Sequence, residues 1–333
     1  MSRKLITIST IMTLMSTSVI ADVPNVAADI APIHSLVSRV MDGVGAPKLI
    51  VQSGASPHGY RLRPSEAKAL QDADHVFWMG EELTPWLDSA IGTLASKASV
   101  TTLLDQQGVI LHDFREGALF EAHDHSAHGD DDHDDHKDHD DHDDHDDHDD
   151  HKDHDDHDDH DDHGSHDPHA WLSPENAKLW LNIIASKLSV SDPENAATYF
   201  MNAAAGQAEI EAMIAEVKAT LKPVQGGKFV VFHDAYQYFE NDFDFYASGA
   251  ISLSDSSDPS PARIEKVQKR IRDEGIQCVL AEPQFKKGLV ATVMEGSDAT
   301  ASVIDPLGAE LETGPKLYTR LIKNMAKTLR NCL

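Results

Sequence analysis

The sequence has little positive charge, only two cysteines and no long hydrophobic segment beyond its first 21 residues. Its 333 residues include 28 lysines and arginines against 57 aspartates and glutamates, which gives a formal net charge of −29. Such an acidic balance argues against nucleic acid as a partner, because phosphate binding needs clustered Lys and Arg. No His-Glu-x-x-His motif occurs, so a helical signature of zinc hydrolases is missing as well.

Residues 1–21 have the pattern of a secretory signal peptide. A basic start (Arg3 and Lys4) precedes an apolar run, diluted with Ser and Thr, that ends at Ala21. The alternative, a membrane anchor, is disfavoured because the run is short and partly polar. No cysteine lies near residue 21, which excludes lipid anchoring through an N-terminal cysteine. We therefore expect a soluble mature protein in the periplasm.

The rest of the sequence alternates short apolar runs with helical patterns. Its 40% hydrophobic residues suffice for packed cores, and its length fits two domains better than one. In the first half a strand, a loop, a helix and a second strand follow one another, which is the signature of a βαβ unit in a parallel sheet, and the pattern returns in the second half. The predicted strands and helices are residues 48–51, 65–72 and 75–79, then 228–232, 261–274, 277–281 and 302–304.

A long helix is predicted between the two halves. Asp192 can cap it, Pro193 suits its first position, and the helical pattern continues to about Leu221. Such a helix would span roughly 44 Å at 1.5 Å per residue. The sequence therefore predicts an α/β protein of two lobes with parallel-type sheets, joined by one long rigid helix; the lobes and the helix are residues 22–190, 222–333 and 192–221.

An insert rich in His and Asp interrupts the N-terminal lobe. Residues 123–166 comprise 15 His, 22 Asp, 2 Lys and five other residues, and they contribute −20 of the net charge of −29. Because the insert has almost no apolar side chains, it cannot form a core, and we expect a disordered, solvated loop. Its imidazoles and carboxylates suit zinc, copper or nickel more than calcium. We expect an auxiliary, lower-affinity metal collector or sensor; a low-complexity linker without a role is the alternative.

Three of the six histidines outside the insert occupy positions typical of a ligand site. His58 and His233 follow predicted strands, and His169 precedes a predicted helix. Ligands of open α/β sheets gather at the carboxyl ends of strands, and three imidazoles with a carboxylate or a water make a zinc site. Asp305, after the strand at 302–304, is the candidate carboxylate. Each histidine alone would more often be an ordinary hydrogen-bonded residue, which is our expectation for His34 and His75, while His112 is ambiguous.

The same segments carry a family resemblance. Residues 54–65 (GASPHGYRLRPS), 167–174 (DPHAWLSP) and 232–239 (FHDAYQYF) resemble motifs of the zinc/manganese-specific solute-binding proteins of bacterial ABC transporters. The insert between the first and second motifs resembles the zinc-specific branch of that family. The three motifs occur in order and the resemblance covers essentially the whole mature chain.

The resemblance implies a metal site between two lobes joined by a long helix. The family's three histidine ligands correspond to His58, His169 and His233, and its C-terminal carboxylate corresponds to Asp305. That carboxylate is a ligand in the manganese branch, whereas water can take its place in the zinc branch. Pro57 stands where some zinc-branch members have a glutamate ligand, so that route to a fourth ligand is closed.

Cys278 and Cys332 are the only cysteines. An exported chain meets oxidising conditions, and a disulfide between them would attach the C-terminus to the second lobe. Two separate free thiols are the alternative. A pairing of these two cysteines also resembles the zinc branch.

Together these features predict a zinc-transport protein and no enzyme. We expect a periplasmic monomer that binds Zn²⁺ with high affinity and delivers it to a membrane permease with a cytoplasmic ATPase. A manganese or iron importer and a periplasmic metal store or chaperone are the alternatives. A zinc hydrolase would need a general base, and Glu282 more plausibly braces a loop.

Overall fold

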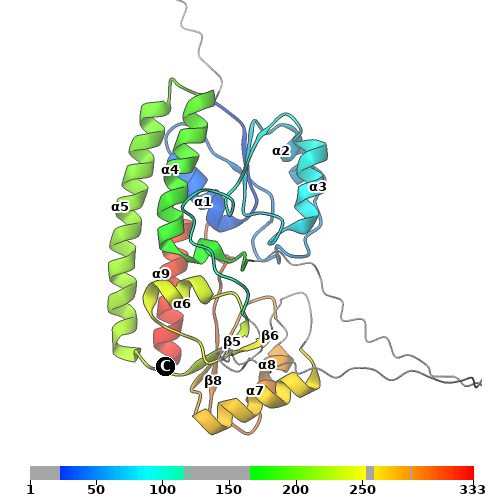
Figure 1. Cartoon of the computed structure of the whole chain (residues 1–333), viewed down its shortest axis with the longest axis vertical. Coiled ribbons are helices and arrows are strands. Elements are labelled where there is room, and N and C mark those ends of the chain that lie inside the picture. Colours follow the sequence, from blue (N-terminus) through cyan, green and yellow to red (C-terminus); the bar gives the residue numbers. More distant parts are fainter. Residues whose placement is uncertain (1–22, 116–119, 121–165, 253–258, 286) are drawn as a thin grey trace, which may run out of the picture.

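The computed structural model describes residues 23–115, 120, 166–252, 259–285 and 287–333. Two α/β lobes lie one above the other, and long helices run along one side of both (Figure 1). Each lobe contains a four-stranded sheet whose described strand pairs are all parallel. The predicted fold class, two lobes with parallel sheets and a long helix, is confirmed. The predicted signal peptide and residues 123–165 of the insert lie outside the described residues.

The N-terminal sheet has the order β2-β1-β3-β4. Its strands β1 and β3 are buried along their whole length, as expected of parallel strands covered on both faces. The predicted strand at 48–51 is shorter than expected, since only Lys48–Leu49 pairs as a strand. The elements of this lobe are β1 (Val26–Ala28), α1 (Ala31–Val40), β2 (Lys48–Leu49), α2 (Pro64–Gln71), β3 (His75–Trp78), α3 (Pro85–Leu94) and β4 (Ser99–Thr102).

The C-terminal sheet repeats this arrangement in the order β6-β5-β7-β8. The predicted helix at 261–274 is confirmed: the Ser260 hydroxyl caps its first turn, and Gly275 ends it in a left-handed conformation with φ of 63°. The elements of this lobe are β5 (Phe229–His233), α6 (Gln237–Phe243), β6 (Ala250–Ser252), α7 (Pro261–Glu274), β7 (Cys278–Ala281), α8 (Lys287–Met294) and β8 (Thr300–Val303).

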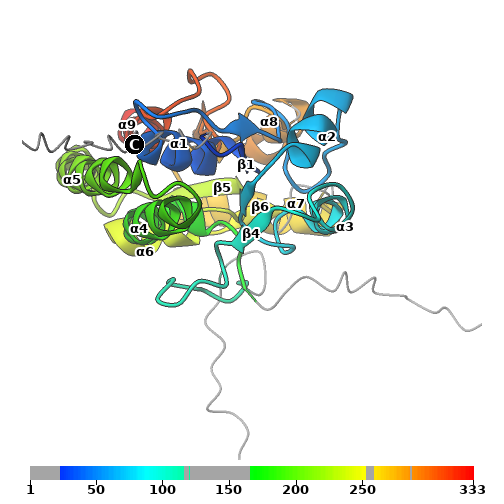
Figure 2. The same ribbon diagram turned by 90° about the horizontal axis from the view of Figure 1, so that it is seen from above.

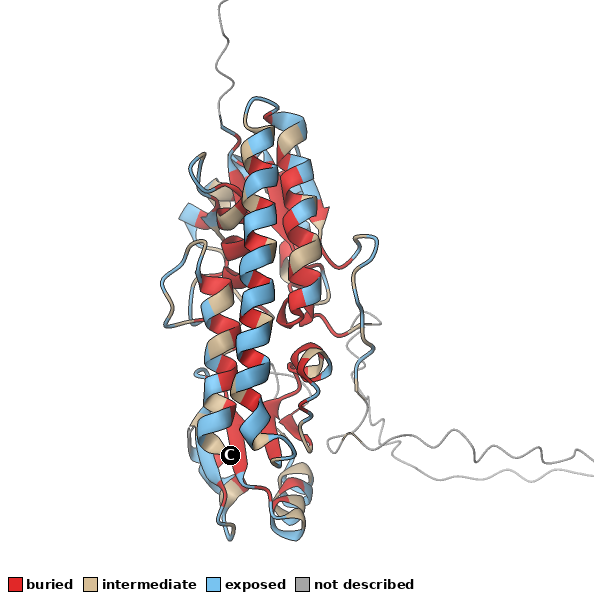
Figure 3. Cartoon of the chain, turned by 90° about the vertical axis from the view of Figure 1, so that its left-hand side faces the viewer, coloured by how far each residue is buried: buried red, intermediate tan, exposed pale blue. Residues whose placement is uncertain are grey.

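Three long helices lie along the lobes, and α5 leads from the first lobe to the second; the three are α4 (Pro174–Ser191), α5 (Ala196–Leu221) and α9 (Leu317–Cys332). Helix α5 packs against α4, α1 and α9 (Figure 2). The outward faces of the long helices are exposed and their inward faces buried (Figure 3). Buried residues recur every three or four positions along α5, as a helix packed on one face requires. They are Tyr199, Ala203, Gly206, Ile210, Met213, Val217 and Leu221.

The long helix begins three residues after its predicted first position, Pro193. Asp192 ends α4 instead of capping α5, and Pro193 disfavours helical conformation at the residue before it. The buried Asp192 carboxylate accepts hydrogen bonds from the Tyr199 hydroxyl at 2.7 Å and the Asn195 amide at 2.8 Å. Asp192 therefore braces the turn between two helices, and α5 begins at Ala196.

One hydrophobic core extends through both lobes. At their junction the Ser35 hydroxyl of α1 donates to the Gly314 carbonyl at 2.7 Å and accepts the Tyr318 N–H at 3.0 Å. The Tyr318 hydroxyl donates to the Trp171 carbonyl at 2.9 Å. Because these contacts join segments far apart in sequence, separating the lobes would break a packed core. Within the described residues, no helix has both the length and the apolar character that a membrane span needs.

The predicted disulfide is present. It joins Cys278, the first residue of β7, to Cys332, the last residue of α9, with Cα atoms 5.6 Å apart. Replacing both cysteines with serine is expected to lower the free energy of unfolding by roughly 2–4 kcal/mol, because a bridge across a separation of this size restricts the unfolded chain. Urea unfolding of the variant and the oxidised protein measures the difference; equal midpoints would contradict the expectation.

Candidate metal centre

Three histidine side chains meet between the lobes. One ring nitrogen of each of His58, His169 and His233 lies within 4.8 Å of the other two. The ring centroids are 5.6 Å apart for His58 and His169, 5.9 Å for His58 and His233, and 4.9 Å for His169 and His233. His169 and His233 are buried, and His58 is half-buried. In the described part of the chain, no other group of three His, Cys, Asp or Glu side chains comes this close.

Parallel strands explain why these histidines converge. His58 lies in the loop that follows β2, and His233 is the last residue of β5, so both stand at carboxyl ends of strands. The two lobes face each other with these ends, where ligand sites of open parallel sheets form. His169 directly precedes a turn of 3₁₀ helix (Ala170–Leu172) at the start of α4 and completes the group.

The His58 loop is fixed by contacts with α2 and α3. The His58 N–H donates to the Ser56 hydroxyl at 3.3 Å, and the Pro57 carbonyl accepts the Trp86 indole N–H at 2.7 Å. The Tyr60 hydroxyl donates to the buried Glu66 carboxylate at 2.7 Å. The loop therefore presents His58 from a supported backbone, although the histidine itself is half-buried.

Asp167 orients the second histidine. Its Oδ1 atom lies 2.6 Å from Nδ1 of His169 and accepts the His169 backbone N–H at 3.0 Å. Burial raises the pKa of Asp167 to about 7, although the N–H of His169 and the charge of Arg115 lower it. A carboxylate that accepts the proton of one ring nitrogen keeps the other, Nε2, unprotonated and more basic, which makes Nε2 a better metal ligand. This role of Asp167 was not predicted, although a carboxylate two residues before a candidate ligand is a usable signal.

An ion network beside His233 was not predicted. Arg115 pairs with Asp234 and Glu240, two carboxylates that are almost fully buried. Burial raises the pKa of Asp234 to about 6, and the hydrogen bond and charge of Arg115 lower it. Arg115 precedes its partners by more than a hundred residues, so no local pattern signals the network.

Asp305 lies outside the histidine group. Its carboxylate accepts three backbone N–H groups of the following turn: those of Leu307 at 3.0 Å, Gly308 at 2.8 Å and Ala309 at 2.6 Å. Both carboxylate oxygens are thereby engaged in shaping residues 305–309. The described structure thus brings together the three predicted histidines and gives the predicted carboxylate a supporting role in its own loop.

Three further described histidines, His34, His75 and His112, have partners of other kinds. His34 Nε2 lies 3.2 Å from the Pro47 carbonyl, and His75 Nε2 lies 2.7 Å from the Ser191 hydroxyl. Burial lowers the pKa of both side chains, which favours neutral imidazoles. His112 Nε2 lies 3.1 Å from the Asn241 amide, and its ring packs on Tyr238 with centroids 4.7 Å apart. None of the three belongs to the metal-binding group.

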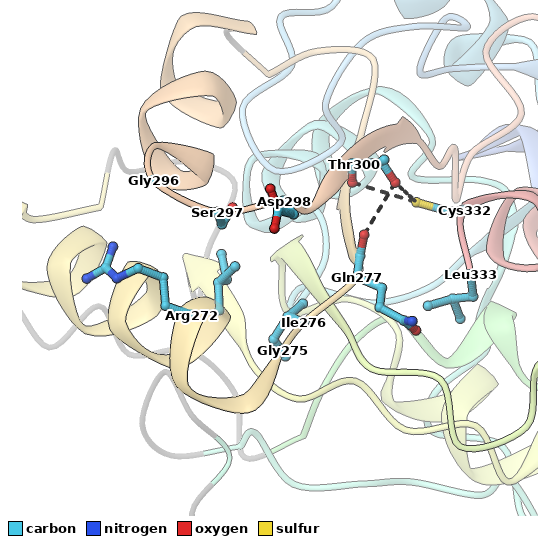
Figure 4. Close-up of a pocket in the computed structure, with 11 residues that line it drawn as sticks. Arg272, Gly275, Ile276, Gln277, Gly296, Ser297, Asp298, Thr300, Cys332 and Leu333 are labelled. Carbon is cyan, nitrogen blue, oxygen red and sulfur yellow. Dashed lines mark hydrogen bonds between the residues drawn. The ribbon is translucent and has the colours of Figure 1, made fainter.

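A pocket of about 560 Å³ lies at the opposite edge of the C-terminal sheet. Figure 4 shows its lining near the disulfide, where the Thr300 hydroxyl contacts the Gln277 carbonyl at 3.3 Å and the Cys332 sulfur at 3.5 Å. This edge holds the amino ends of β7 and β8, so the pocket is remote from the carboxyl-end position of His233. Ligand sites of parallel sheets form at the carboxyl ends, and we assign this pocket no part in metal binding.

Three neutral imidazoles at these separations can take one ion in a tetrahedral arrangement, with a water at the fourth position. Nitrogen donors of this type suit zinc, copper and nickel better than manganese or magnesium, which prefer oxygen ligands.

Curated relatives match nearly the whole chain. It is 50% identical over 308 residues to the high-affinity zinc uptake system protein ZnuA of Brucella abortus (strain 2308), covering 92% of this chain and 91% of that protein. It is 46% identical over 314 residues to the protein of the same name from Paracoccus denitrificans (strain Pd 1222), covering 94% and 93%.

A solved structure described as "Crystal structure of ZnuA" matches with a TM-score of 0.70 and 21% identity, covering 93% of this chain and 99% of that chain. At this identity the likeness shows the shared fold alone. The family model described as "ZnuA: Zinc-uptake complex component A periplasmic" matches residues 26–332. The chain therefore belongs to the ZnuA family of periplasmic zinc-uptake components.

Proposed function

We propose that this protein binds one Zn²⁺ ion in the periplasm through His58, His169 and His233 and delivers it to an ABC transporter. The convergence of three imidazoles from two lobes is the observation that carries the proposal. Zinc is the transported substrate, and a water molecule is the proposed fourth ligand. The acceptor is a membrane permease powered by a cytoplasmic ATPase, and the binding protein acts as a monomer. The proposed role contains no catalytic step.

Release of the ion is proposed to need local movement instead of wide opening. The continuous core and the contacts of Tyr318, in the C-terminal lobe, with Ser35 and Trp171 of the N-terminal lobe resist their separation. The His58 side chain is the most exposed of the three ligands, and its loop rests on α2 and α3 instead of the long helices. We therefore propose that the docked permease draws the ion out past the His58 loop.

The flanks of the His/Asp-rich insert lie beside the proposed site. We call residues 112–115 and 166–168 the neck. An antiparallel bridge joins Asp113 to His166, whose Nδ1 atom lies 3.0 Å from the Asp113 carboxylate, and the Asp167 N–H donates to the His112 carbonyl at 2.8 Å. His169 follows the neck directly. An ion collected by the insert would therefore arrive close to the tight site, which supports the proposed role as an auxiliary collector.

Zinc titration of the intact protein and of a variant lacking residues 123–165 tests both parts of the proposal. This deletion retains His166 and its contact with Asp113. We expect the intact protein to bind one ion tightly and several weakly, and the deletion variant to keep only the tight ion. Weak ions alone in the intact protein would favour a metal store. Preferential binding of Mn²⁺ in competition with Zn²⁺ would favour a manganese importer.

A further inference from the structure

One arginine of the neck reaches across to the C-terminal lobe. The Nε atom of Arg115 donates to both carboxylate oxygens of Asp234, at 3.0 and 3.1 Å. Its Nη1 atom donates to Glu240 at 2.6 Å, and its Nη2 atom contacts both carboxylates. Asp234 directly follows His233, and Glu240 belongs to α6, the next helix. A single guanidinium therefore fixes the segment that leads away from the third histidine.

The two carboxylates have little access to water. Asp234 is 8% exposed and Glu240 is 1% exposed. The ring of Phe120 covers the guanidinium, with its centroid 3.6 Å from the Arg115 Cζ atom, which adds a cation–π contact. Breaking a buried ion pair by removing one partner leaves an uncompensated charge. Without Arg115, two acidic groups would remain buried side by side, and the Asp234 segment would have to rearrange.

Further polar contacts join the neck to α6. The Tyr238 hydroxyl donates to the Asp167 carbonyl at 2.8 Å and accepts the His112 N–H at 3.1 Å. Asp167 in turn orients His169. One interface thus includes the support of the second histidine and the segment that follows the third, and Arg115 supplies its buried cation.

We propose that Arg115 is a positioning residue for zinc binding. By holding Asp234, it fixes the end of β5 from which His233 projects, and it couples the neck of the insert to the metal centre. The inference rests on the proposed function, because it assumes that His233 binds the ion. Supporting groups around metal ligands typically contribute 10- to 100-fold to affinity. Since Arg115 acts through the neighbour of a ligand, we expect an effect near the lower limit.

The variant Arg115→Gln tests this role, with Arg39→Gln as its matched control. Arg39 is similarly buried, with 13% of its side chain exposed against 16% for Arg115, and it also bonds a carboxylate through two nitrogens, Nε and Nη2 to Glu209 at 3.1 and 3.0 Å. It joins α1 to α5, outside the metal-binding group. Each full-length protein is loaded with one equivalent of Zn²⁺, and transfer to a chromogenic chelator gives the dissociation rate. One equivalent of Co²⁺ gives a visible spectrum that reports the geometry around the ion.

We expect Arg115→Gln to release zinc about 10-fold faster and to change the cobalt spectrum, while Arg39→Gln changes neither. Thermal unfolding of both variants measures how much each arginine stabilises the fold. Arg115→Lys, which keeps the charge but loses the planar fork, replaces the Gln variant if that fails to fold. The inference would be overturned if the Arg115 variant had the zinc dissociation rate and the cobalt spectrum of the wild-type protein. Equal changes in the Arg39 variant would overturn it as well. Failure of the wild-type protein to bind zinc would instead refute the proposed function.

Discussion

Replacing His169 with alanine is expected to weaken zinc binding by roughly 10²- to 10⁴-fold. Zinc sites contribute about 10–16 kcal/mol of apparent binding free energy, so loss of one of three protein ligands removes about 3–5 kcal/mol. His169 is held in place by Asp167, whose carboxylate lies 2.6 Å from its Nδ1 atom. Its loss also leaves the buried Asp167 without that partner. Competition with a chelator of known affinity at pH 7.5 measures the change.

His75→Ala is the matched control for this substitution. Both histidines are 4% exposed, but His75 contacts Ser191 and lies outside the metal-binding group. We expect the control to lose stability and to bind zinc like the wild-type protein. The three-histidine centre would be contradicted by wild-type affinity in the His169 variant, or by an equal loss of affinity in the control.

The elements that were predicted well are those with local signals. Helix α7 begins at a Ser-Pro pair and ends at Gly275, so its bounds follow from the capping chemistry of a few residues. The positions of His58 and His233 were also predictable, because ligand sites of parallel sheets form at the carboxyl ends of strands. The two residues belong to different sheets, so their convergence also depends on how the two lobes face each other. The predicted positions need only the order of elements along the chain.

Two residues make interactions that their residue type and position alone did not reveal. The residue type of Asp192 indicates a helix cap, but its carboxylate accepts a hydrogen bond from the buried Tyr199 hydroxyl at the turn between α4 and α5. Asp305 was predicted as a candidate ligand from its position after a strand, and its carboxylate also accepts three backbone N–H groups of its own turn, which the prediction did not include. In each case the residue type indicated a polar role. The actual partner depended on how the surrounding backbone folds.

The Arg115 network shows the same limit more strongly. Its two partners, Asp234 and Glu240, lie 119 and 125 residues away along the chain. A lone arginine beside a highly acidic insert would be interpreted as a solvated counter-charge. Only the packing of the neck against α6 makes it a buried cation between two carboxylates.

Lowering the pH from 7.5 to 5.0 is expected to weaken zinc binding by about 10⁴-fold. An imidazole must be neutral to bind metal, and a free imidazole, with a pKa of about 6.5, loses about 30-fold in its neutral fraction over this range, so proton competition at three such ligands sets the scale of the effect. Buried groups act on the fold in both directions over this range, so the fold is verified at each pH. Burial lowers the pKa of His34 and His75, which favours unfolding as the pH falls, whereas it raises the pKa of Asp29 from 3.8 to about 7. A raised folded-state pKa means tighter proton binding by the native protein, so this group favours folding as the pH falls from 7 towards 4. Zinc titrations at both pH values, with circular dichroism to verify the fold, test the expectation, and an affinity that stays constant would exclude an all-histidine site.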